Sequence, residues 1–130
     1  MSLGKIFLYA EIQVSIPFSG LDWRPVDAEL KTVPGLRSKT WLAGIGANTI
    51  GGFYEFDSAA NALAYARGAL AAAAGRLGGA LSVKLFDGDV TAEASRASHS
   101  PFYVETAFSA PAPQGAAAIE AQERASAIDA

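Results

Sequence analysis

A strand is followed directly by a helix in the stretch GGFYEFDSAANALAYARG, residues 51–68. Side chains of an extended chain point alternately to the two faces of a sheet. Phe53 and Glu55 are therefore predicted to share one face, and Tyr54 and Phe56 the other. The fold and the function both depend on what covers the face that mixes an aromatic ring with a carboxylate.

The second half of this stretch begins a helix that continues to a pair of glycines. Ser58 is a suitable N-cap, because its hydroxyl can accept a hydrogen bond from a backbone N–H of the first turn. Apolar side chains then recur at spacings of three or four and predict one buried helix face: Leu63, Ala66, Leu70, Ala74 and Leu77. Gly78 and Gly79 end this helix.

The segments on either side complete a pattern of six elements. Alternation of apolar and polar residues predicts four strands, over residues 5–16, 36–43, 50–56 and 80–86. Helical spacing of Val26, Leu30 and Val33 predicts a short helix between the first two strands. The order β-α-β-β-α-β is that of a ferredoxin-like α+β domain, with a four-stranded antiparallel sheet and both helices on one face.

Composition limits the class of protein. A chain of 130 residues has the size of one domain. Its ten Lys and Arg residues are scattered and its net charge is −3, so nucleic acid is not an expected partner. The absence of cysteine excludes disulfides, thiol catalysis and thiolate metal sites, and we expect no metal and no cofactor. No signal peptide or membrane-spanning segment is recognised, so the expected location is cytoplasmic, with no membrane partner.

One face of the predicted sheet is too aromatic for an open surface. By alternation it carries the following residues: Phe7, Tyr9, Glu11, Gln13, Lys39, Trp41, Phe53, Glu55, Lys84 and Phe86. Leu42 is assigned to the opposite face, under the helices. Five aromatic side chains offer on the order of 750–1,250 Å², whereas the largest apolar patch of a typical monomer is roughly 300–600 Å². A second copy of the sheet would cover this face and enclose a partly polar cavity, so we expect a homodimer; an open sheet facing solvent is the alternative.

Residues 90–130 lie outside the ferredoxin-like domain, which we place at residues 1–89. They are rich in Ala, Ser and Pro. Phe102, Val104 and Phe108 alternate as in a short strand, and an Ala-rich helix is expected from residue 116. We expect this C-terminal extension to pack on the barrel of the dimer or on the partner subunit.

Four segments together resemble a known family: PGLRSKTW (34–41), GGFYEF (51–56), ALAY (62–65) and KLFD (84–87). Their order and spacing are similar to those of the YdhR-like family, a branch of the dimeric α+β barrel superfamily related to antibiotic biosynthesis monooxygenases. The resemblance extends from about Pro34 to Asp87. It implies the ferredoxin-like fold, the dimer, and a monooxygenase activity of the kind that oxidises phenolic substrates without flavin or metal.

Such chemistry needs a base, a group that stabilises an anion, and a pocket that excludes water. The candidate catalytic residues are Glu11 and Glu55 as bases and Lys39 and Lys84 as partners of the anion. The candidate substrate-binding residues are Tyr9, Trp41, Phe53 and Phe86. Alternatively, these charges form ion pairs across neighbouring strands and have no catalytic role.

Two function classes therefore remain open. The first is a cofactor-independent monooxygenase that acts on a small hydroxylated aromatic substrate in the barrel cavity. The second is a ligand-binding dimer that is non-catalytic or that acts as an isomerase or decarboxylase, since one fold hosts many chemistries. A small aromatic ligand suits both classes.

Overall fold

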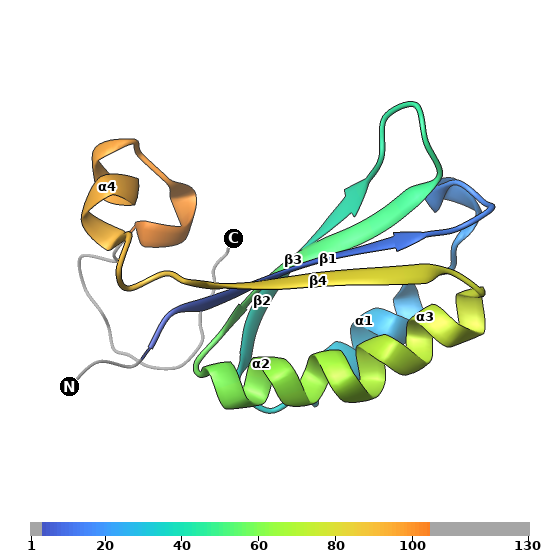
Figure 1. The fold of residues 1–130 in the computed structure, drawn as a ribbon, viewed down its shortest axis with the longest axis horizontal. Coiled ribbons are helices and arrows are strands. Elements are labelled where there is room, and N and C mark those ends of the chain that lie inside the picture. Colours follow the sequence, from blue (N-terminus) through green and yellow to red (C-terminus); the bar gives the residue numbers. More distant parts are fainter. Residues whose placement is uncertain (1–3, 105–130) are drawn as a thin grey trace. The chain divides into compact units, whose positions relative to one another are not determined.

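A computed structural model describes residues 4–104, which divide into two compact units between Thr91 and Ala92. The first unit contains an antiparallel sheet with the strand order β2-β3-β1-β4. Its strands are β1 (Ile6–Gln13), β2 (Leu36–Ala43), β3 (Thr49–Phe56) and β4 (Ala80–Asp87). The helices of this unit cover one face of the sheet (Figure 1). The predicted ferredoxin-like α+β fold is confirmed.

The helical layer consists of α1 and one long helical segment. The 3-10 turn η1 (Phe18–Gly20) precedes α1 (Arg24–Leu30). The long segment is composed of α2 (Ala59–Tyr65), the π-helical turn η2 (Ala66–Leu70) and α3 (Ala71–Leu77). The predicted cap is present, because the Ser58 hydroxyl accepts a hydrogen bond from the Asn61 N–H at 3.1 Å.

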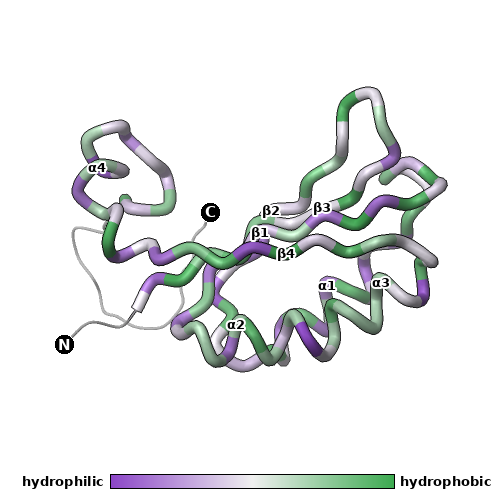
Figure 2. Tube along the Cα trace, viewed as in Figure 1, coloured by the Kyte–Doolittle hydropathy of each residue, from purple (hydrophilic) through white to green (hydrophobic). Residues whose placement is uncertain are grey.

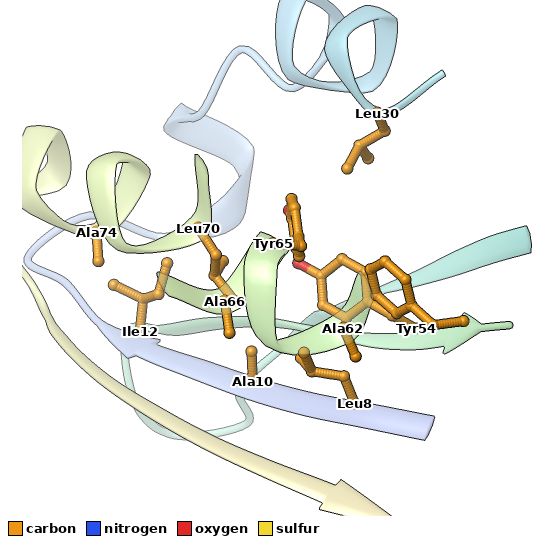
Figure 3. Close-up of a cluster of buried hydrophobic side chains, with 11 residues drawn as sticks. Leu8, Ala10, Ile12, Leu30, Tyr54, Ala62, Tyr65, Ala66, Leu70 and Ala74 are labelled. Carbon is orange, nitrogen blue, oxygen red and sulfur yellow. The ribbon is translucent and has the colours of Figure 1, made fainter. Parts of the chain in front are cut away.

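The π turn keeps one row of small and apolar side chains against the sheet. Ala62, Ala66, Leu70 and Ala74 are all buried and lie four residues apart. In a regular α-helix of 3.6 residues per turn, a row with this spacing drifts around the helix. A turn with i→i+5 hydrogen bonds has more residues per turn and compensates for the drift. Figure 3 shows this row pointing at β1.

The core lies between this helical row and the inner face of the sheet. Its largest fully buried side chains are Leu8, Tyr54 and Phe56. The rings of Tyr54 and Phe56 both contact Tyr65 from α2, at centroid distances of 5.3 and 5.7 Å. Hydrophobic and hydrophilic stretches alternate along the strands and helices, as Figure 2 shows. This alternation is what two packed layers with one dry interface require.

A β-bulge in β2 changes which of its side chains face the helices. Leu36 pairs with Phe56, but the next pair in the ladder is Ser38 with Glu55, so Arg37 is an extra residue. One extra residue reverses the alternation of every later side chain in the strand.

The assignment of Lys39, Trp41 and Leu42 by simple alternation is therefore wrong. Lys39 pairs with Tyr54 and Trp41 with Gly52, so both lie on the inner face under the helices. Trp41 packs against the buried core cluster. Leu42 takes the outer face instead. The sheet face turned away from the helices thus carries four of the five expected aromatic side chains, without Trp41.

The second unit, as far as it is described, is a short helix and a turn. Helix α4 (Ala92–Ala97) precedes the 3-10 turn η3 (Pro101–Tyr103). Phe102 lies in this turn, where its N–H is bonded to the Ser100 hydroxyl at 3.3 Å, so the strand expected to start there is wrong at its beginning. Phe108 and the helix expected from residue 116 lie outside the described residues. Within residues 4–104, no helix combines the length and the apolar character needed to cross a membrane.

Candidate functional site

A cavity of about 180 Å³ lies between the sheet and the helices of the first unit. For comparison, an apolar cavity of about 150 Å³ holds a benzene molecule. Its described lining is mostly apolar and contains two cations and two tyrosines but no carboxylate: Ala10, Ile12, Leu21, Val26, Lys39, Trp41, Ile50, Gly51, Gly52, Tyr54, Tyr65, Leu70, Ala73, Arg76 and Leu77.

Gly52 makes room for the polar end of this cavity. A Cβ at this position would lie 2.8 Å from Cε of Lys39 and 2.8 Å from two ring atoms of Tyr54. Real Cβ atoms essentially never approach other atoms so closely, so any side chain at position 52 would displace one of these groups. The missing side chain at Gly52 therefore leaves room for the side chains of Lys39 and Tyr54, which lie beside each other on the neighbouring strands β2 and β3.

The ammonium group of Lys39 is held by aromatic rings and not by a carboxylate. Its Nζ lies 3.4 Å from the centroid of the Trp41 ring and 4.9 Å from that of Tyr54. It forms no hydrogen bond or ion pair with any described residue. Burial lowers the pKa of Lys39 to about 8, and the charge of Asp27 opposes this shift. Asp27 itself forms an ion pair with Lys31 at 2.9 Å. Lys39 thus has an appreciable amine fraction near neutral pH.

Two buried tyrosines lie beside this lysine. The hydroxyl of Tyr65 donates a long hydrogen bond of 3.5 Å to the hydroxyl oxygen of Tyr54. Burial raises the pKa of both phenols, so both stay protonated near neutral pH. One hydrogen bond between two hydroxyls leaves one of the two phenolic O–H groups without an acceptor among the described residues, although both tyrosines are buried. A buried phenol normally has a hydrogen-bond partner, so this O–H is available to a ligand oxygen in the cavity.

An aromatic cluster borders the cavity at Trp41. The ring of Phe18 contacts Trp41 edge-on at 5.9 Å, and the ring of Trp23 lies at 6.4 Å. Both residues precede α1, so the connection from β1 to α1 brings them over the inner face of β2. Neither Phe18 nor Trp23 lines the cavity, so Trp41 is the ring of this cluster that a ligand in the cavity would contact.

Glu55, by contrast, is part of an ion-pair cluster on the outer face of the sheet. Its Oε2 accepts hydrogen bonds from Lys5 Nζ and Arg37 Nη1, each at 3.0 Å. Arg37 also donates to the carbonyl oxygen of Gly4 at 2.8 Å. The bulge is what places Arg37 beside Glu55. Because two cations bind one oxygen of this carboxylate, the contacts of Glu55 do not support its expected role as a base.

The other predicted site residues also lie on the outer face. The Tyr9 hydroxyl donates a hydrogen bond to the carboxylate of Glu11, and this bond raises the pKa of Tyr9. Tyr9 pairs with Phe53 on one side and Lys84 on the other. Phe86 is 50% exposed.

The sheet therefore separates the predicted site into two groups. Lys39 and Trp41 lie in the cavity, and the remaining six lie across the sheet from it: Tyr9, Glu11, Phe53, Glu55, Lys84 and Phe86. The alternative expectation is that the two glutamates pair with Lys39 and Lys84. Glu55 instead forms its ion pairs with Lys5 and Arg37.

Sequence reasoning missed the cavity residues Gly52, Tyr54, Tyr65 and Arg76. Alternation assigns Tyr54 correctly to the inner face, but it does not reveal that the hydroxyl is a polar group in need of a partner there. Tyr65 lies off the predicted row of apolar helix positions, yet Tyr65 and Leu70 both line the cavity. The described residues contain no group of three or more His, Cys, Asp or Glu side chains that could hold a metal ion.

The solved structures that are similar to this chain include the two described below. No protein-family model matches the chain, and no curated protein matches it closely enough to count. The structure of the NE2512 protein of unknown function from Nitrosomonas europaea covers 67% of this chain and 91% of its own length, with 20% identity and a TM-score of 0.46. The structure of a monooxygenase from the gene ActVA-Orf6 of Streptomyces coelicolor, in complex with the ligand nanaomycin D, covers 65% of this chain and 87% of its own, with 20% identity and a TM-score of 0.48. Likenesses this distant carry no argument about activity.

Replacing Gly52 with Ala tests the packing at the polar end of the cavity. The new methyl group collides with the buried Tyr54 ring, so we expect a loss of about 1–3 kcal/mol in the free energy of unfolding, measured by urea denaturation. Gly75→Ala is the control, because Gly75 lies in α3, where an added Cβ would meet no other group within 4 Å. This change should stabilise the helix by about 0.5–1 kcal/mol. Equal stability changes in the two variants would contradict the crowding at Gly52.

The titration of Lys39 tests its burial. The pKa is about 8 in the folded chain and 10.5 ordinarily, so between these values the unfolded chain holds a proton that the folded chain has released. The free energy of unfolding then rises with pH across this window. We expect Lys39→Met to be more stable than the wild type at pH 7, by about 1–3 kcal/mol, with the difference shrinking towards pH 10.5. NMR of ¹³C-labelled lysine measures the pKa directly, and a Lys39 signal that titrates near 10.5 would contradict the buried position.

Proposed function

We propose that the cavity between sheet and helices binds a small hydroxylated aromatic molecule and oxidises it with dioxygen. The observation that carries this proposal is Lys39, whose amine lies in an apolar cavity between two aromatic rings without a counter-ion among the described residues. The resemblance of residues 34–87 to the YdhR-like family supports the oxygenase class, and membership of that family is part of the proposal.

Lys39 and Tyr54 both act on the hydroxyl oxygen of the substrate, in different roles. A phenol stacked on Trp41 presents its hydroxyl to Lys39, whose amine form removes the proton. The resulting oxyanion faces the Lys39 ammonium and accepts a hydrogen bond from the Tyr54 O–H. Both groups are already in place within a mostly apolar lining, so little reorganisation is needed as the charge develops.

Deprotonation makes the ring electron-rich enough to react with oxygen. For 1-naphthol, the negative charge spreads to the para carbon, and O₂ adds there. One oxygen atom becomes the new carbonyl, the other leaves as water, and the para C–H is lost. The products are 1,4-naphthoquinone and water, and the substrate supplies all four electrons that reduce O₂.

The outer sheet face has a separate role in the proposal, as the contact between two copies of the chain. Phe86 is half exposed at the edge strand, and the rings of Phe7 and Phe53 stack at 4.9 Å beside it. Glu55 is paired with Lys5 and Arg37, so its carboxylate would keep its counter-ions in such a contact. We therefore keep the homodimer through this face, with the ligand cavity inside each subunit instead of between the two sheets.

Oxygen uptake with 1-naphthol tests the activity. We expect consumption of one O₂ per quinone formed, with a rate that rises through about pH 8 as Lys39 loses its proton. Lys39→Met should lower the rate about 10²-fold or more, and Lys39→Arg should not restore it, because arginine remains protonated. Lys84→Met, which removes a lysine from the opposite face, should leave the rate unchanged.

Three outcomes decide between the function classes. Uptake that survives Lys39→Met would refute the assigned base. Binding of naphthol in calorimetry without any oxygen uptake would refute the oxygenase and leave the ligand-binding class. Absence of both signals would refute the cavity as a site for phenols.

Phe86→Asp tests the dimer. Because Phe86 is already 50% exposed in the single chain, the change should not unfold the subunit, but it places an unpaired carboxylate in the proposed contact. Light scattering should give the mass of a dimer for the wild type and of a monomer for the variant. Ile45→Asp, in the fully exposed loop between β2 and β3, is the control and should remain dimeric. A monomeric wild type would contradict the proposed contact.

A further inference from the structure

A groove between α1 and the long helical segment lies next to the cavity. This groove, of about 320 Å³, shares four lining residues with the cavity: Val26, Tyr65, Ala73 and Arg76. A ligand too large for the cavity alone would therefore extend past these residues into the groove. Arg76, near the end of α3, is the only cation among the described residues that line both spaces.

Arg76 is a cation with no protein partner in the described part of the chain. Its guanidinium forms no hydrogen bond or ion pair with any residue there, and it is exposed. No described residue that lines the cavity is acidic, whereas the lining contains both Lys39 and Arg76. Two cations and no anion around an apolar space produce a positive potential there. A negatively charged ligand is the occupant that balances it.

From this arrangement we propose that the cavity selects an aromatic acid, with its ring in the apolar part of the cavity beside Trp41 and its carboxylate at Arg76, which lines both the cavity and the groove. This inference deepens the proposed function and rests on the same site. It assigns the two cations different tasks: Lys39 acts on the hydroxyl of the substrate, and Arg76 binds the acid group at the other end. The planar fork of an arginine matches the two oxygens of a carboxylate.

The surrounding charges favour a single acid group. Glu29 of α1 lines the groove but not the cavity, on the far side of the shared residues. Asp27, also on α1, is engaged by Lys31. A second carboxylate on the ligand would approach Glu29, so a monoacid is the preferred class.

Calorimetry with two near-isosteric ligands tests the selectivity. The probes are 6-hydroxy-2-naphthoic acid, an anion at pH 7, and its neutral amide, 6-hydroxy-2-naphthamide. We expect the wild type to bind the acid about tenfold more tightly than the amide, as a hydrogen-bonded ion pair open to solvent allows. Higher salt should reduce this preference, because exposed charges are screened. Arg76→Gln should abolish the preference while leaving the affinity for the amide within about twofold.

Arg67→Gln is the matched control, since it removes the same charge from an exposed position of the same helical segment that lines neither space. It should keep the preference for the acid. Equal affinity of the wild type for acid and amide would overturn this inference but not the proposed function. An equal loss in Arg67→Gln and Arg76→Gln would also overturn it, since net charge alone would then explain the preference. Failure of both ligands to bind would refute the cavity as the site and the proposed function with it.

Discussion

The extra residue at Arg37 is the constraint on which the site depends. It is inserted in β2 between Leu36, which pairs with Phe56, and Ser38, which pairs with Glu55, and it reverses the alternation of the strand after it. On the outer face, it brings a guanidinium to Glu55. On the inner face, it turns Lys39 and Trp41 under the helices. A regular strand would bury Leu42 there instead and would leave no charged group in the core.

Burying a lysine in this position lowers the stability of the fold unless neighbouring groups compensate for the lost solvation of its charge. Burial disfavours the ammonium form, and the two aromatic faces return only part of the lost solvation. The fold accommodates the lysine with a glycine at position 52 and with an amine that titrates near pH 8. Large perturbations of this kind concentrate at functional sites, because a strictly structural core has no need of them. The phenolic O–H that the Tyr54–Tyr65 pair leaves unpaired and the π turn after Tyr65 belong to the same local departure from regular packing.

The sequence predicted the architecture and failed at the site for one reason. Alternation along β1, β3 and β4 assigns the faces correctly, since these strands are regular, and Ser58 and the glycines mark the ends of the second helix. In β2, the segment LRSKTWLA mixes polar and apolar side chains at both parities, so its pattern does not reveal the bulge. The bulge at Arg37 places Lys39 and Trp41 on the inner face of the sheet, whereas Glu11 and Glu55 lie on the outer face. In the second helix, the pattern starts the buried row at Leu63, whereas the structure buries Ala62 and, three residues later, Tyr65. This is why the pattern places Tyr65 outside the buried face.

A crystal structure of the protein with bound 1-naphthol tests the central claim most directly, because the two faces of the sheet offer two distinct places for a flat ligand. The account predicts electron density between the sheet and the helices, with the ring against Trp41 and the hydroxyl oxygen within hydrogen-bond distance of Lys39 Nζ and the Tyr54 hydroxyl. Density on the outer face, between Tyr9 and Phe53, with an empty inner cavity at saturating ligand, would contradict it.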